Sequence, residues 1–196
     1  NYMVNTSGNP DYAFAFKMVL EEQIKETKIV KIHWNVSKFG VLFPQIEVQA
    51  VIIAGNNIRY ISGKSAKFIY DNKLGNGSII NVIRTCDVIP DVHEIIKSSK
   101  VPDMPDVKYR WNDSKVNIIL EDNSDNKEMN IKKIVDFFKT INVGNLGIGI
   151  ITTLYDNGFD SIKKVININY DDLIKIKGFK KKNLNKIINN IKIGLE

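Results

Sequence analysis

The sequence predicts a mixed fold in which a β-rich first half is followed by an α-helical end. Two observations carry this prediction. In the first hundred residues, apolar and polar side chains alternate in short runs that glycines separate, which is typical of strands. From Glu128 onward the apolar residues recur every three or four positions, which is typical of amphipathic helices. A chain of 196 residues is long enough for one large domain or two smaller ones.

Five strands are expected after an isolated first run of alternating aromatic and small residues, 12–17. They are residues 27–36, 41–51, 57–62, 77–84 and 88–96, with one short helix at 64–72 before the fourth strand. Five strands with a helix in that place is the plan of an OB-fold barrel, a fold whose face and loops often bind nucleic acids or sugars.

The second half is expected to contain a connector and then helices. Residues 98–128 are polar and proline-containing, with one hairpin at 107–120. A helix at 129–140 should follow, because Ile131, Ile134, Val135 and Phe138 share one face. Two similar units come next: a glycine turn at 143–147 before a helix at 148–156, and a helix at 171–176, a turn at 176–180 and a helix at 181–193. This is the plan of a helix-hairpin-helix domain.

The glycine turns are candidate phosphate-binding sites, because such a turn presents unpaired backbone N–H groups at the positive end of a helix. The candidates there are Gly144, Gly147, Gly178, Lys180, Lys181 and Lys182. The charge supports this reading: the net charge is +6, and seven lysines but no acid lie between Lys175 and Lys192. An ordinary helical hairpin with a solvated lysine face is the alternative.

The composition excludes several classes. The single cysteine, Cys86, cannot form an internal disulfide or a cysteine-based zinc site alone. No apolar run reaches membrane-span length, and the N-terminus lacks a signal-peptide pattern. We therefore expect an intracellular protein without a membrane partner. His33 and His93 are expected to be strand residues rather than ligands or bases.

The segment from Arg84 to Pro90 suggests a phosphate-gripping arginine at a strand end, because a guanidinium donates two parallel hydrogen bonds. A surface salt bridge is the simpler alternative, and Asp87 is expected to orient Arg84 in either case.

Together these segments resemble the NAD-dependent DNA ligases. Tyr-Ala-Phe-Ala-Phe-Lys17 is similar to that family's last nucleotidyltransferase motif. Arg-Thr-Cys-Asp-Val-Ile-Pro90 is similar to its OB motif R-x-G-D-V-I-P, with Cys86 in place of the glycine. Ser37-Lys38-Phe39-Gly40, followed by Leu42 and Pro44, resembles its G-R-T-G-x-L-x-P loop.

The resemblance implies domains and residue roles. Residues 1–22 would end the nucleotidyltransferase domain, 23–97 would be the OB-fold domain, 98–127 a connector hairpin and 128–196 a partial helix-hairpin-helix domain. Lys17 would contact the phosphates of the adenylate or NAD, and Arg84 would approach the nick. Val88, Ile89 and Lys38 would meet the DNA, although lysine lacks the fork of the family's arginine.

Three departures narrow this expectation. The family's nucleophile motif, K-x-D-G, does not occur in the sequence, so the chain alone should not adenylate itself. Residues 101–130 contain no cysteine, which excludes the family's four-cysteine zinc module and requires the hairpin to fold without metal. Two hairpin units are present where the family usually has four.

The leading hypothesis is the DNA-clamping C-terminal portion of an NAD-dependent DNA ligase, an enzyme of DNA replication and repair that seals nicks by AMP transfer. NAD and Mg²⁺ would serve the full enzyme, with no cofactor bound by this chain alone. Its partners would be nicked duplex DNA and a nucleotidyltransferase domain. The alternative is a non-catalytic DNA-binding module that treats nicked and intact duplex alike, or prefers single strands through stacking on Phe39 or Trp34. An RNA-binding OB protein and an ATP-dependent ligase fit less of the sequence.

Overall fold

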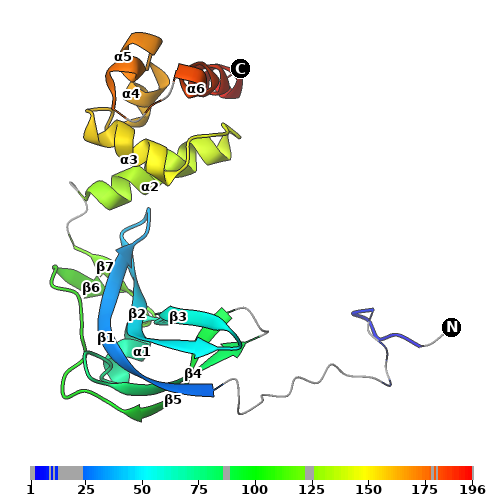
Figure 1. Cartoon of the computed structure of the whole chain (residues 1–196), viewed down its shortest axis with the longest axis vertical. Helices are drawn as coiled ribbons and strands as arrows, with labels where there is room; N and C mark the ends of the chain where they lie inside the picture. Colours follow the sequence, from blue (N-terminus) through cyan, green and yellow to red (C-terminus); the bar gives the residue numbers. More distant parts are fainter. Residues whose placement is uncertain are drawn as a thin grey trace.

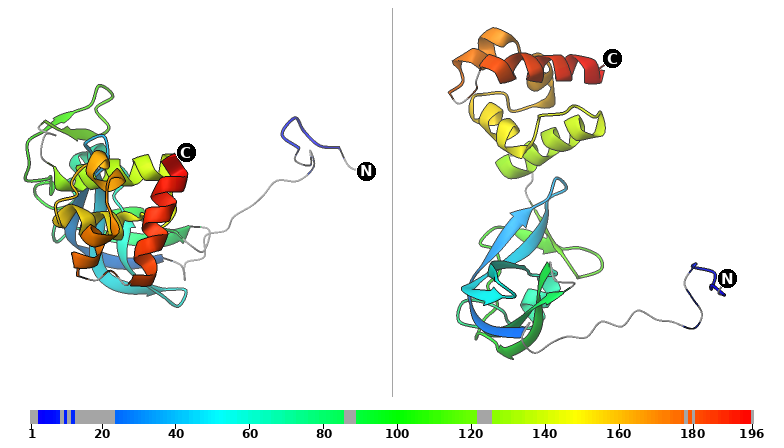
Figure 2. Two further views of the ribbon diagram at one scale, coloured as in Figure 1. Left: turned by 90° about the horizontal axis from the view of Figure 1, so that it is seen from above. Right: turned by 45° about the vertical axis from the view of Figure 1, so that its right-hand side comes forward.

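The computed structural model describes residues 3–8, 10, 12, 24–85, 89–121, 126–177, 179 and 181–195, of which 85 and 181–183 are described by their backbone alone. A strongly curved β-sheet forms one end of the molecule, and a group of helices lies at the other end, beyond the tip of the hairpin that β1 and β2 form (Figures 1 and 2). The expected order of a β-rich half followed by an α-helical half is confirmed.

The five expected strands and the short helix are present. They are β1 (Ile24–Val36), β2 (Val41–Ile53), β3 (Asn56–Ser62), α1 (Ala66–Asp71), β4 (Ile79–Thr85) and β5 (Ile89–Lys97). The side chain of Ser65 caps α1 by accepting a hydrogen bond from the amide of Phe68, 3.1 Å away. The expected strand at 12–17 lies outside the described residues, apart from Tyr12, which is in a turn.

The long strand β1 shapes the barrel because it belongs to two antiparallel pairings. Residues 24–28 pair with β4, and residues 29–36 pair with β2 after a bulge between Ile29 and Lys31. β5 continues the sheet beside β4, and β3 continues it beside β2. Lys64, just after β3, contacts the β5 residues Asp91 and Val92, which brings the two free edges together. Bulges bend strands in this way, so a flat sheet becomes a barrel.

Isoleucines and valines from β1 to β5, together with Ile69 of α1, fill the barrel. Ile29, Ile46, Ile53, Ile69 and Ile80 are completely buried within it. One close approach requires a glycine: a Cβ at Gly63 would lie 2.6 Å from the Cβ of Pro44, and the Gly63 amide donates to the Pro44 carbonyl at 3.0 Å. Gly63 therefore lets the chain leave β3 tightly packed against β2.

The connector folds as a hairpin that extends the barrel sheet. Its strands are β6 (Tyr109–Trp111) and β7 (Ile118–Leu120), and β7 pairs with the start of β2. The side-chain oxygen of Asn112 accepts hydrogen bonds from the amides of Val116 and Asn117, both at 3.1 Å, which fixes the turn. Strand pairing and this turn order the described part of the connector.

In the described part of the second half, the helices are α2 (Lys127–Thr140), α3 (Ile148–Asp156), α4 (Ile162–Ile166), α5 (Tyr170–Lys175) and α6 (Lys181–Leu195). Sequence analysis found four of them and missed α4, whose five residues are too short to show a helical period. The helices share one core that includes Phe138, Ile151, Leu154, Leu173 and Leu184, all completely buried. The expected pairs α2–α3 and α5–α6 pack against each other.

A small core joins the two ends. Met129 of α2 is 1% exposed and packs with Val36, Leu42, Ile118 and Leu120 of the barrel and the connector. The Lys132 ammonium donates to the Val36 carbonyl. α2 is therefore attached directly to the hairpin of β1 and β2.

Candidate nucleic-acid interface

The turn between β1 and β2 holds the first candidate, Lys38. Ser37 fixes this turn, because its hydroxyl accepts the amides of Phe39 and Val41 at 3.3 and 3.0 Å. Gly40 has a φ of 80°, which favours glycine. The turn leaves the ring of Phe39 exposed, with the Lys38 ammonium 4.9 Å from its centre.

The structure pairs Lys38 with the helical end. Its Nζ lies 2.7 Å from Oδ1 of Asp136 on α2, and both side chains are partly exposed. Sequence analysis expected Lys38 to face DNA and did not foresee this partner, because 98 positions separate the two residues. A phosphate at this turn would compete with the Asp136 carboxylate for the same ammonium group.

Arg84 lies near the end of β4, opposite Pro90 of β5. It is half-buried, and its Nε atom is buried without a hydrogen-bond partner among the described residues. A buried donor left unpaired costs about 1–3 kcal/mol, so such an atom is usually satisfied by a ligand or water. Ile89, on the neighbouring strand, is 64% exposed. Val88 and Asp87 lie outside the described residues, so their expected roles stay predictions.

The first glycine turn joins α2 to α3 as expected. Gly147 is the N-cap of α3 and supplies no side-chain hydrogen bond to the first amides of that helix. Asn190 of α6 holds the turn from behind by donating from Nδ2 to the Gly144 carbonyl at 3.0 Å. A hollow of about 350 Å³ lies beside the turn, with Lys139 on its wall. The uncapped amides and this lysine together suit an anion.

The second glycine turn is only partly described. Gly178 and Lys180 lie outside the described residues, and Lys181 and Lys182 are placed by backbone alone, in the first turn of α6. Lys17 also lies outside. The expected phosphate contacts of these residues therefore stay predictions.

Sequence analysis missed a charged cluster on the barrel surface. Glu47 of β2 accepts hydrogen bonds from Nε2 of His33 at 2.6 Å and from Nε and Nη2 of Arg59 at 3.1 and 2.8 Å. The hydrogen bond from His33, and then the one from Arg59, lowers the pKa of Glu47 below its usual range. His33 is thus a strand residue, as expected, but with a carboxylate partner. A glutamate inside an apolar strand was the available signal.

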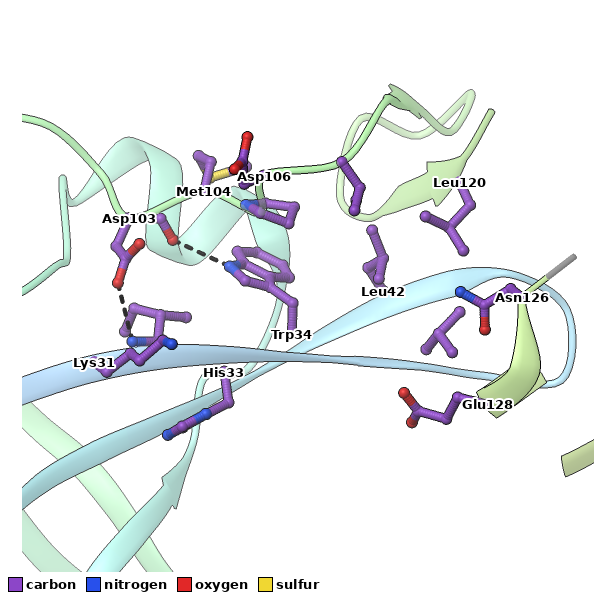
Figure 3. A pocket seen from close by; sticks show the side chains of 14 residues that line it. Lys31, His33, Trp34, Leu42, Asp103, Met104, Asp106, Leu120, Asn126 and Glu128 are labelled. Atoms are coloured by element: carbon purple, nitrogen blue, oxygen red, sulfur yellow. Dashed lines mark hydrogen bonds between the residues drawn. The ribbon is translucent and has the colours of Figure 1, made fainter. Parts of the chain in front are cut away.

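A cavity of about 380 Å³ lies between β1, the connector and the start of α2 (Figure 3). Its polar groups serve the fold. Asp103 accepts the amide of Ile32 at 3.1 Å through its carboxylate, and its carbonyl accepts from the indole nitrogen of Trp34 at 3.1 Å. Trp34 is therefore half-buried and held in place, which makes it a poor stacking platform.

Two general features bear on partners. Across the described residues, no three or more His, Cys, Asp or Glu side chains gather as a metal site. Within the same part of the chain, no helix is long and apolar enough to cross a membrane.

Comparison with known proteins identifies the barrel. Residues 26–103 match the family model of the NAD-dependent DNA ligase OB-fold domain. The resemblance to NAD-dependent DNA ligases is confirmed. The match spans the barrel strands and ends at Asp103, where the connector meets β1.

Full-length relatives of this ligase domain extend the similarity over most of the chain. The chain is 41% identical over 192 residues to a DNA ligase of Acanthamoeba polyphaga mimivirus, which covers 98% of the chain and 30% of that protein. It is 31% identical to putative DNA ligase 205R of Invertebrate iridescent virus 6, over 88% of the chain and 27% of that protein. A DNA ligase of Ligilactobacillus salivarius is 23% identical, over 95% of the chain and 30% of that protein. The chain thus spans under a third of the length of these relatives.

Proposed function

We propose that this chain is the DNA-clamping C-terminal portion of an NAD-dependent DNA ligase, in which residues 128–196 form a partial helix-hairpin-helix domain. The full enzyme would seal nicks in duplex DNA by transferring AMP from NAD. It would act in replication and repair, inside the cell and with the DNA that is its substrate. The match of the barrel to ligase OB domains and the named ligase relatives over 88–98% of the chain support this proposal.

The observation that carries the site is the buried Nε of Arg84, which has no hydrogen-bond partner among the residues that the structure describes. Two oxygens of one phosphate would accept parallel hydrogen bonds, one from this Nε and one from a neighbouring Nη of the same guanidinium. Arg84 would approach the 5′-phosphate at the nick, while exposed Ile89 and its neighbour Val88 would lie against the minor groove. Lys38 would join them once a phosphate displaces Asp136.

The helices α2–α6 would bind the sugar-phosphate backbone of the duplex beside the nick. The uncapped amides of α3 after Gly147 offer one phosphate seat, and the lysine-rich second turn offers another. Contacts of this kind carry no sequence information, so binding should be independent of sequence. NAD and Mg²⁺ would act in the full enzyme. The described residues offer no metal-ligand group, and Lys17, the candidate for the adenylate phosphates, lies outside them.

The test measures binding of the purified chain to labelled duplexes by fluorescence anisotropy. Three DNAs are compared: a nicked duplex with a 5′-phosphate, the same nick without the phosphate, and the intact duplex. We expect the phosphorylated nick to bind most tightly, and Arg84→Lys to remove that preference because lysine keeps the charge but loses the fork. Affinity should fall with salt, each phosphate contact adding about −0.9 to the log–log slope.

Two outcomes would count against the proposal. Salt-independent affinity would exclude a backbone clamp. Equal affinity for all three duplexes would favour the alternative, a non-catalytic DNA-binding module built from the same folds.

A further inference from the structure

A second candidate surface lies on the outer face of β1, β2 and β3. In β2 the residues Leu42, Pro44 and Ile46 point into the core, whereas Phe43 and Gln45 are exposed on the opposite side. Glu47 shares that outer side and lies opposite Lys31 of β1 and Tyr60 of β3. We call Lys31, His33, Phe43, Glu47, Arg59 and Tyr60 the outer face. It uses none of the residues expected to contact the nick.

Glu47 holds the side chains of His33 and Arg59 in fixed positions on the outer face. Its two carboxylate oxygens are divided between its partners, Oε2 accepting from His33 and Oε1 from Arg59. Two of the five N–H donors of Arg59 are used by Glu47, and the side chain remains 62% exposed. The guanidinium is thus oriented from behind and open in front.

Two aromatic rings stand beside these charges. Tyr60 is 46% exposed, with the Arg59 guanidinium 5.8 Å from its ring centre and the His33 ring 6.0 Å away, tilted by 60°. Phe43 is 45% exposed and lies four residues along β2 from Glu47, the residue that pairs with Tyr60. At the usual rise per residue, Phe43 and Glu47 are about 13 Å apart along the strand. Both rings are therefore open to solvent on one side and available for stacking.

The charge of the outer face is positive. Glu47 is the sole acid in the sequences of β2 and β3, and its carboxylate is already engaged by Arg59 and His33. Lys31 of β1 is exposed directly opposite it. Exposed rings on a positively charged strand face fit a polyanion whose bases are free to stack, because stacking is worth about 1–3 kcal/mol per base.

We propose that the outer face binds single-stranded DNA, with bases stacked on Tyr60 and Phe43 and phosphates held by Arg59 and Lys31. A duplex hides its base faces, so this surface fits an unpaired strand better than an intact helix. The inference rests on the proposed function, because a strand end displaced from the duplex at a nick is the unpaired DNA that this surface would meet. The outer face would then hold that displaced end while the chain binds the duplex.

The test is the affinity of the full chain for a labelled oligo(dT) of roughly 16 nucleotides, the upper site size of one OB-fold. We expect Tyr60→Leu to weaken binding by about five- to 150-fold, which corresponds to the loss of one stacked base. The matched control Tyr60→Phe keeps the ring and should bind within about twofold of the wild type. Far-UV circular dichroism verifies that each variant is folded. If Tyr60→Leu does not fold, Phe43→Leu replaces it, because Phe43 carries the other ring proposed to stack a base.

Parallel titrations with the phosphorylated nicked duplex separate this inference from the proposed function. We expect Tyr60→Leu to leave nicked-duplex affinity unchanged. Unaltered oligo(dT) affinity in both Tyr60→Leu and Phe43→Leu would overturn the inference, as would an equal loss on both DNAs, which would make the face a duplex contact. Oligo(dT) binding that depends on Tyr60, with no binding to nicked duplex, would support this inference while the proposed function fails.

Discussion

Replacement of Met129 by alanine should loosen the junction between the barrel and the helices. Met129 is 1% exposed and fills the small core that α2 shares with β2 and β7. Truncation of a buried methionine costs about 2–5 kcal/mol through lost burial and the cavity that remains. With a urea dependence of about 2 kcal/mol per molar, the unfolding midpoint should fall by about 1–2.5 M.

The assay is urea unfolding followed by tryptophan fluorescence. The chain has two tryptophans, Trp34 and Trp111, and both pack against the core that contains Met129. Their emission therefore reports on the junction, whereas circular dichroism at the helical band reports mainly on α2–α6. Two signals are needed because a chain with two cores need not unfold in one step.

Two control variants complete the experiment. Met129→Leu keeps the volume and should cost less than about 1.5 kcal/mol. Ile151→Ala opens a similar cavity in the helical core and should move the circular dichroism transition more than the fluorescence transition. A fluorescence midpoint that does not change in Met129→Ala would refute the reasoning, because α2 would then not be docked on the barrel.

Three further predictions concern charge and metal. Asp136→Asn should change stability by less than about 1 kcal/mol, as for other surface ion pairs, and should raise duplex affinity because it releases Lys38; weaker binding in a titration would contradict competition at this turn. The lowered pKa of Glu47 means that its ionised form stabilises the fold above pH 4.5, and this contribution is lost as the pH falls through the lower, folded-state pKa. Glu47→Gln should therefore flatten the dependence of the melting temperature on pH in this acidic range. An unchanged profile would contradict a stabilising role for the hydrogen bonds of Glu47 with His33 and Arg59. A chelator should leave the melting temperature unchanged, because strand pairing orders the connector; a drop on adding EDTA would reveal a metal requirement.

The strands of the barrel were predictable because the sequence of each strand shows which of its residues are buried and which are exposed. Alternation with period two marks a strand that has one face in the core, and glycines mark its ends. The bounds moved by up to three residues, as for β1, which begins at Ile24 rather than Thr27. The helix α4 was missed, since a cap at Ser161 and one buried Val165 are too little signal for a period.

The candidate site was predictable only where a motif lies within one segment. Arg84 was found from the residues around it, and only the fold revealed that its Nε is buried with no hydrogen-bond partner among the described residues. Lys38 was expected from the resemblance of its segment to a loop of the ligase family, but its pairing with Asp136 was not foreseen. The outer face was missed altogether, because His33, Glu47 and Arg59 come from three strands that mean little separately.

The sequence alone therefore determined the order of the elements, the absence of cysteine ligands from the connector, and the family that the barrel resembles. Those properties depend on local spacing, charge and residue type. The tertiary structure decided which side chains meet: Met129 with the residues of the small core that joins the two ends, Lys38 with Asp136, and Glu47 with His33 and Arg59. The physical reason is that strand register and helix docking bring together residues that are far apart in the chain, and neither leaves a pattern within a single segment.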